Sequence, residues 1–333
     1  MYLGTSLLAA LSLLATVVSA VPHSQIRRGE GHQNVVYWGQ NGGEVIENND
    51  LASYCNSQSG IDIIVLAFLY EYGNGQRISS GGFGQSCFIT TFGEGQNCEE
   101  LGRAITTCQN RGIKIILSLG GAVGAYGLTS QQEAEAIGSN IWAAYGNSGY
   151  SGVPRPFGNA FVNGWDFDIE ASSGNQYYRY LISTLRSKFS LDPAHKYYIT
   201  GAPQCPIPEP FMQPIIDTSQ FDYLWVQFYN NPDCSLPHPN FDDWVRNIAN
   251  TPSAGAKIFM GIPASPYAST GTLSGERYYM NPSSLADVVR RFSGNNAFGG
   301  IMMWSAGFSD SNMNNGCTYA QETKHILNTG SPC

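Results

Sequence analysis

Short apolar runs rich in β-branched residues recur eight times along the chain. They cover residues 34–38, 61–69, 113–119, 161–170, 197–201, 223–229, 257–262 and 300–304. Most are continuous rather than alternating, as expected of parallel strands that are covered on both faces. The pattern therefore predicts eight buried parallel strands.

Stretches with helical spacing separate these runs. They cover residues 49–56, 98–110, 131–144, 176–189, 210–217, 241–248, 282–292 and 319–327. Eightfold alternation of strand and helix predicts an α/β fold, a single-domain (β/α)8 TIM barrel. A doubly wound sheet is the alternative, but the glycine-rich residues 120–124 lack the Lys-Ser/Thr of a phosphate loop.

The fourth run contains three carboxylates at alternate positions, Asp166, Asp168 and Glu170. Alternate side chains of a strand share a face, so these acids form a column with steps of roughly 6.6 Å. Phe167 and Ile169 point the other way, and the run is too apolar for a solvated edge strand. Like charges packed inside a barrel indicate shared protons or a reaction, and we expect catalysis.

Polar and aromatic residues also follow several of the other predicted strands. They occupy residues 37–41, 68–71, 118–121, 227–231 and 303–305. Active sites of such barrels lie at the carboxyl ends of the strands. These residues are therefore expected to line one ligand cleft beside the acid column.

The N-terminus predicts a signal peptide over residues 1–20, with an apolar run ending at Val18-Ser19-Ala20. This run is shorter than the roughly 20 residues that span a bilayer. A polar segment, 21–33, contains Arg27 and Arg28, where the chain could be trimmed. Residues 34–333 would then form the catalytic domain of a secreted protein that does not cross a membrane.

The formal net charge of −8 argues against a nucleic-acid partner, which would favour a basic surface. Charged residues make up 13% of the chain and aromatic residues 12%, a balance that favours a neutral, hydroxyl-rich ligand stacking on rings.

The eight cysteines show neither CxxC nor Cys/His zinc spacing, so we expect no metal and four disulfides. No Gly-x-Ser-x-Gly motif of a serine hydrolase is present. We expect no cofactor.

With these motifs in order, the chain resembles a family-eighteen glycoside hydrolase of the class III, hevamine-type chitinases and their fungal relatives. The matching motifs are Tyr-Trp-Gly-Gln-Asn at 37–41, Ala-Phe-Leu at 67–69, Ser-Leu-Gly-Gly at 118–121, Asp-Phe-Asp-Ile-Glu at 166–170, Gln-Phe-Tyr-Asn-Asn at 227–231 and Met-Trp-Ser at 303–305. Together they span essentially the whole mature chain. The family's usual Asp-Gly-x-Asp-x-Asp-x-Glu pattern has Asn163 in place of its first acid, where we expect an effect on packing or on the charge of the column.

The resemblance implies that Glu170 is the general acid and that the substrate's own 2-acetamido oxygen is the nucleophile. Asp168 would orient the acetamido group, Asp166 would share a proton with Asp168, and Tyr229 would hydrogen-bond the acetamido carbonyl. Repulsion from the aspartates should keep Glu170 protonated. The cleft residues implied by the resemblance are Tyr37, Gln40, Phe68, Gly121, Gln227, Asn230 and Trp304, the last as a stacking floor.

The resemblance also implies non-proline cis peptides at Ala67–Phe68 and Trp304–Ser305. It further implies the disulfides Cys55–Cys108, Cys87–Cys98 and Cys205–Cys234, which leaves Cys317 with Cys333 by elimination.

The resulting hypothesis is a secreted, monomeric endochitinase that cleaves the β-1,4 bonds of chitin or its oligosaccharides with retention. One alternative is a weakly active or inactive oligosaccharide-binding lectin or glycosidase inhibitor of the same fold. Another is an endo-β-N-acetylglucosaminidase or lysozyme with the same acids. A divalent metal site for phosphoryl transfer is a third, although no basic phosphate-binding residues adjoin the acids.

Overall fold

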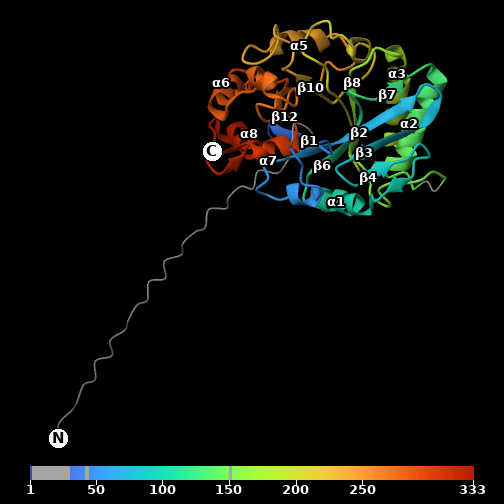
Figure 1. Cartoon of the computed structure of the whole chain (residues 1–333), viewed down its shortest axis with the longest axis horizontal. Coiled ribbons are helices and arrows are strands. Elements are labelled where there is room, and N and C mark those ends of the chain that lie inside the picture. Colours follow the sequence, from blue (N-terminus) through green and yellow to red (C-terminus); the bar gives the residue numbers. More distant parts are fainter. Residues whose placement is uncertain (2–30, 42–44, 150–151) are drawn as a thin grey trace.

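The computed structural model describes Met1 and residues 31–41, 45–149 and 152–333. The predicted signal peptide and dibasic segment therefore lie outside the described residues, apart from Met1. Eight parallel strands close into a barrel because β1 pairs with both β2 and β12 (Figure 1). The barrel strands are β1 (Gln33–Trp38), β2 (Ile63–Gly73), β6 (Lys114–Gly121), β8 (Gly164–Ile169), β9 (Tyr198–Gly201), β10 (Tyr223–Gln227), β11 (Lys257–Pro263) and β12 (Phe298–Trp304).

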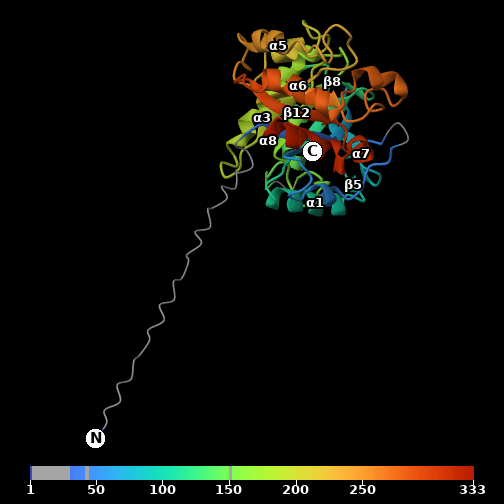
Figure 2. The same ribbon diagram turned by 90° about the vertical axis from the view of Figure 1, so that its left-hand side faces the viewer.

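Helices surround the barrel, and the C-terminus lies beside α7 and α8 (Figure 2). They are α1 (Glu99–Asn110), α2 (Gln131–Tyr145), α3 (Tyr178–Phe189), α4 (Gln213–Ile216), α5 (Phe241–Ile248), α6 (Pro282–Phe292), α7 (Ala306–Ser311) and α8 (Tyr319–Thr329), with 3₁₀ turns at Leu51–Tyr54, Asn175–Tyr177 and Leu273–Tyr278. Local signals set several helix starts: Ser130 and Asn281 cap α2 and α6, and Thr318 forms a capping box on α8.

The predicted (β/α)8 architecture is confirmed, with differences in its details. The helix expected at 49–56 is only the turn Leu51–Tyr54, and the one expected at 210–217 shortens to α4. Propensity alone does not hold such short segments as full helices. The first strand begins at Gln33, one residue before the expected start of the domain.

Six additional strands in the described part of the chain were not predicted. They are β3 (Gln76–Phe83), β4 (Cys87–Ile89), β5 (Gly95–Gln96), β7 (Ala125–Gly127), β13 (Met313–Asn314) and β14 (Cys317–Thr318). Strand β2 continues beyond the barrel to Gly73 and pairs antiparallel with β3. The link contains Asn74 and Gly75, both with positive φ, which is the Asn-Gly signal of a tight hairpin.

Two buried clusters account for the continuous apolar runs. Trp165, Phe167 and Ile169 of β8 belong to the cluster between the strands and the helices. A second cluster, which includes Val35 and Trp225, fills the barrel interior. Each barrel strand therefore needs apolar residues on both faces, except where the interior holds the site.

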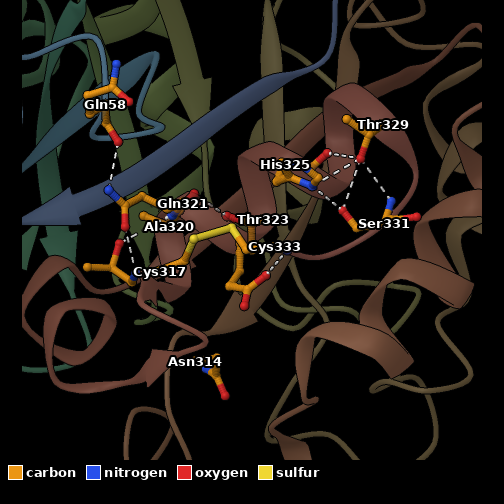
Figure 3. Close-up of a disulfide and its surroundings, with 12 residues drawn as sticks. Gln58, Asn314, Cys317, Ala320, Gln321, Thr323, His325, Thr329, Ser331 and Cys333 are labelled. Atoms are coloured by element: carbon orange, nitrogen blue, oxygen red, sulfur yellow. Dashed lines mark hydrogen bonds between the residues drawn. A yellow bond between two sulfur atoms is a disulfide. The ribbon is translucent and has the colours of Figure 1, made fainter.

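Four disulfides join the pairs Cys55–Cys108, Cys87–Cys98, Cys205–Cys234 and Cys317–Cys333. These are the four expected pairs, including the one reached by elimination. The last bridge ties the chain end to the start of α8, where the backbone N–H of Cys333 donates to Glu322 (2.6 Å). Figure 3 shows this bridge beside Gln321, whose side chain donates to the carbonyl oxygen of Gln58 (2.9 Å).

Candidate active site

Strand β8 carries the acid column into the barrel. Asp166 has no exposed surface and Asp168 is 5% exposed, whereas Glu170, just beyond the strand end, is partly exposed. The apolar residues between them face the helices, so strand alternation alone produces this division. The three acids therefore run from the sealed interior to the open end of the barrel.

Asp166 is an acceptor for donors from four other strands. Its Oδ1 accepts from Thr200 Oγ1 and Trp225 Nε1, and its Oδ2 from Ser118 Oγ and Tyr37 Oη, at distances of 2.6 to 2.7 Å. Burial raises the pKa of Asp166, and these four hydrogen bonds oppose that rise because they favour the ionised form.

Asp168 lies in a different environment. Gln227 Nε2 donates to its Oδ1 at 3.2 Å. Burial raises the pKa of Asp168 well above its usual range, and the charges of Glu170 and Asp166 raise it further. The surroundings of both aspartates favour the neutral form, and those of Asp168 favour it more strongly.

Glu170 is held at the end of β8 by its backbone and its side chain. Its backbone N–H donates to Tyr126 Oη (3.0 Å), and its Oε2 accepts from Gln204 Nε2 (3.3 Å). Burial raises the pKa of Glu170, while hydrogen bonds from Gln204 and Gln227 lower it. The direction of the shift is as expected, but its main cause is burial rather than repulsion by the aspartates.

A cavity of about 180 Å³ opens above Asp168 and Glu170. Its lining residues are Tyr37, Phe68, Ala122, Asp168, Glu170, Ala202, Gln204, Gln227, Tyr229, Asn230, Ser269, Met302 and Trp304. A larger cavity, of about 640 Å³, lies at the opposite end of the barrel, among residues that precede or begin its strands, such as Asp222 and Lys257, and contains none of the three acids. The smaller cavity is the candidate active site because it combines carboxylates with aromatic walls.

One wall of the smaller cavity consists of three packed rings. The Phe68 and Trp304 rings stack with centroids 5.9 Å apart, and Tyr37 lies 5.7 Å from Trp304. Trp304 stays partly exposed, which leaves its surface available to a ligand. Two peptide bonds next to these rings, Ala67–Phe68 and Trp304–Ser305, are cis, as expected.

Most of the predicted cleft residues line this cavity, and two do not. Gln40 donates instead to the carbonyl oxygen of Ala67 (2.8 Å), beside the cis peptide. Gly121 lies behind Phe68: its φ is +94°, and a Cβ there would lie 3.1 Å from the phenyl ring. Both residues support the aromatic wall from outside the cavity.

Several residues of the site were not identified from the sequence. Ala202, Gln204, Ser269 and Met302 line the cavity although they belong to no quoted motif. Only Gln204 had a usable signal, because it is a polar residue that follows a predicted strand. The described residues contain no cluster of three or more potential ligands that could hold a metal ion.

Comparison with known proteins shows a family match for the chain. The family model for glycosyl hydrolases family 18 matches residues 33–277. The chain is 58% identical over 340 residues to Endochitinase 2 of Metarhizium robertsii, covering 99% of this chain and 80% of that protein.

Solved structures show the same fold. The ICChI chitinase from Ipomoea carnea is 31% identical with a TM-score of 0.72, covering 88% of this chain and 98% of that one. The xylanase and alpha-amylase inhibitor protein XAIP-II from Scadoxus multiflorus is 27% identical with a TM-score of 0.69, covering 91% and 99%.

Proposed function

The chain belongs to glycosyl hydrolases family 18 and is a chitinase, and we propose that it is a secreted, retaining endochitinase with Glu170 as general acid. The observation that carries the proposal is the environment of the acid column. Glu170 borders a cavity with aromatic walls, and the pKa of its carboxyl group is raised. The neighbouring Asp168, deeper in the barrel, favours its neutral form.

In the proposed reaction, Glu170 protonates the glycosidic oxygen as the bond from that oxygen to the anomeric carbon breaks. The carbonyl oxygen of the 2-acetamido group attacks the anomeric carbon and forms an oxazolinium ion. Water then opens this ring and gives a proton to Glu170, so the anomeric configuration is retained.

The remaining residues assist the acetamido group. Asp168 accepts a hydrogen bond from the acetamido N–H, which raises the nucleophilicity of the carbonyl oxygen. Tyr229 Oη donates to that oxygen and fixes its approach. Asp166, which accepts from four donors, shares a proton with Asp168. Trp304 stacks beneath the sugar.

Replacing Glu170 by Gln tests the assignment directly. Hydrolysis of soluble chitin oligomers should fall by about 10²- to 10⁴-fold because the amide cannot donate the required proton. Oligosaccharide affinity and the unfolding temperature should stay near those of wild type. Glu135→Gln, on the exposed face of α2, is the matched control and should keep full activity. A Glu170→Gln enzyme as fast as wild type would overturn the proposal.

A binding protein is the second candidate, favoured by the inhibitor XAIP-II with the same fold. Wild-type protein that binds chitin oligomers without cleaving them would support it. Product analysis with anomeric NMR separates the two functions and tests retention. N-glycan and peptidoglycan substrates in the same assay test the glucosaminidase and lysozyme alternatives.

Secretion is part of the proposal. Four disulfides form and persist in oxidising compartments. Among the described residues, no helix has the length and apolar character to cross a bilayer. Mass spectrometry of the protein recovered from culture medium should show an N-terminus after Ala20 or after Arg28, whereas an intact Met1 would contradict a cleaved signal.

A further inference from the structure

Two side-chain amides from loops, those of Asn231 and Gln204, form a chain of hydrogen bonds that ends on Glu170. We call this chain, in which each amide donates to the next group, the relay. Gln204 follows β9, and its Nε2 donates to Glu170 Oε2 at 3.3 Å. Asn231 follows β10, and its Nδ2 donates to Gln204 Oε1 at 3.1 Å. A side-chain amide has one donor end and one acceptor end, so the donor from Asn231 determines which end of Gln204 faces the acid.

The orientation of Asn231 is itself fixed. Its Nδ2 also approaches the carbonyl oxygen of Tyr229 at 3.3 Å, and a carbonyl can only accept. Its backbone N–H donates to Ser235 Oγ, and Ser235 Oγ donates back to its carbonyl oxygen. The amide of Asn231 therefore presents its NH₂ to Gln204 and not its oxygen.

The two loops are also joined covalently. The disulfide Cys205–Cys234 begins one residue after Gln204 and ends in the loop of Asn231. The backbone N–H of Gln204 donates to Glu209 Oε1 (3.0 Å), and Gln204 forms a bridge with Gln227 of β10. These contacts hold the backbone of both loops, so the two amides extend from fixed positions.

We propose that Gln204, oriented by Asn231, is a positioning residue for the general acid. Gln204 donates to Oε2, which favours that oxygen as the acceptor and Oε1 as the carrier of the proton that is transferred to the leaving oxygen; Gln227 is a second donor to the same carboxyl group. This inference rests on the proposed role of Glu170. It assigns to Gln204 the selection of which carboxyl oxygen of Glu170 carries the proton, a function that packing alone does not supply.

The relay also influences the ionisation of Glu170. A donor to the carboxylate stabilises the ionised form and lowers the pKa that burial raises. Removing this donor should raise the pKa of Glu170 and allow the proton to occupy either oxygen. The rate of proton transfer should fall even though more enzyme carries the proton at neutral pH.

The test is the pH dependence of chitin-oligomer hydrolysis by Gln204→Ala. The alkaline limb of kcat/KM should move up by roughly one pH unit, and kcat should fall about tenfold with KM little changed. Asn240→Ala is the matched control, because Asn240 supports the same loop through the carbonyl oxygen of Cys205 (2.9 Å) without touching either amide. Its alkaline limb should coincide with that of wild type.

Asn231→Asp tests the direction of the relay. The aspartate would accept from Gln204 Nε2 and turn Gln204 Oε1 toward Glu170. The alkaline limb of kcat/KM should therefore move to higher pH by at least as much as in Gln204→Ala. The added negative charge would itself shift the alkaline limb to higher pH, and that part of the shift would persist in the double variant Gln204→Ala/Asn231→Asp. A relay through Gln204 requires that most of the Asn231→Asp effect disappear in that background.

The outcomes separate this inference from the proposed function. If Glu170→Gln is inactive but Gln204→Ala keeps the wild-type limb, Glu170 remains the acid and the positioning role is wrong. An equal shift in Asn240→Ala would mean that the loop as a whole, and not the amide, controls the acid. Thermal unfolding of each variant verifies that folded proteins are compared.

Discussion

At the scale of single residues, burial controls the acids of this protein more than the spacing of like charges. Burial is the largest cause of the raised pKa of Asp166, Asp168 and Glu170 alike. The differences between them come from their neighbours: four donors oppose the rise at Asp166, two amides oppose it at Glu170, and nearby carboxylate charges add to it at Asp168. The sequence showed a column of charges, but the neighbours that distinguish its members come from other strands.

The direction of the Glu170 shift predicts an alkaline limit to catalysis. Its pKa is raised from 4.5, so the acid stays protonated above the range of an exposed glutamate and loses its proton as pH rises through the folded value. Values of kcat/KM for a soluble oligomer should therefore fall on the alkaline side. A rate that increased continuously with pH through this range would be inconsistent with Glu170 as acid.

Glu47 provides a residue-scale prediction outside the cavity. It is 2% exposed and accepts from the backbone N–H groups of Gly39 (2.6 Å) and Gly307 (3.3 Å). Burial raises its pKa to about 8. The neutral acid is favoured in the folded chain, so its contribution is complete below about 4.5 and is lost as pH rises toward 8.

Glu47→Gln should remove that dependence, since glutamine does not titrate. The free energy of unfolding of wild type should fall relative to the variant between pH 4.5 and 8, by an amount on the order of a few kcal/mol. Urea unfolding at several pH values measures it, and Glu135→Gln should run parallel to wild type. If the free energy of unfolding depended on pH in the same way in Glu47→Gln and in wild type, the raised pKa of Glu47 would be contradicted.

At the scale of elements, the two ends of β8 have different roles: the residue before the strand makes structural contacts, and the residue after it belongs to the candidate active site. Asn163 precedes the strand, at the end opposite Glu170, and its Oδ1 accepts from Ile115 N (2.9 Å) and Gln109 Nε2 (3.0 Å). It therefore joins β8 to β6 and α1. Both contacts use an acceptor oxygen that an aspartate would also supply, so the expected effect of the departure from the family's usual aspartate stays a prediction.

Two substitutions at this position should differ in stability but not in activity. Asn163→Ala leaves both donors without their acceptor and should cost about 1–3 kcal/mol in urea unfolding. Asn163→Asp keeps the acceptor oxygen and should cost less. Both should retain wild-type kcat, and a large loss of kcat in Asn163→Asp would show that this position reaches the acid column.

The element scale also shows where periodicity misleads. The eight barrel strands were predicted because they coincide with apolar runs, most of which are continuous. The β3–β5 extension is richer in glycine and polar residues. Its strands are held by successive pairing, β3 on β2, β4 on β3 and β5 on β4, rather than by burial of an apolar run. The turn at Asn74 and Gly75 was the local signal for it.

At the scale of the whole molecule, the disulfides close loops of different length. Cys317–Cys333 spans 16 residues and Cys55–Cys108 spans 53. Chain entropy predicts that replacing each pair by serine costs about 3 and about 4 kcal/mol, respectively. Urea unfolding of the two double variants measures which of them loses more free energy of unfolding. Neither pair lines the cavity, so kcat of the folded variants should be unchanged.

The sequence by itself determined the alternation of strands and helices, the direction of the acid column and the motifs that resemble a family. These depend on local periodicity and on residue types, which are written directly in the chain. Barrel closure decided the rest: the four strands that donate to Asp166, the place of Gln204 against Glu170, and the positions of Gln40 and Gly121 outside the cavity. Such contacts join segments far apart in sequence, and burial depends on the assembled interior, so no local pattern encodes them.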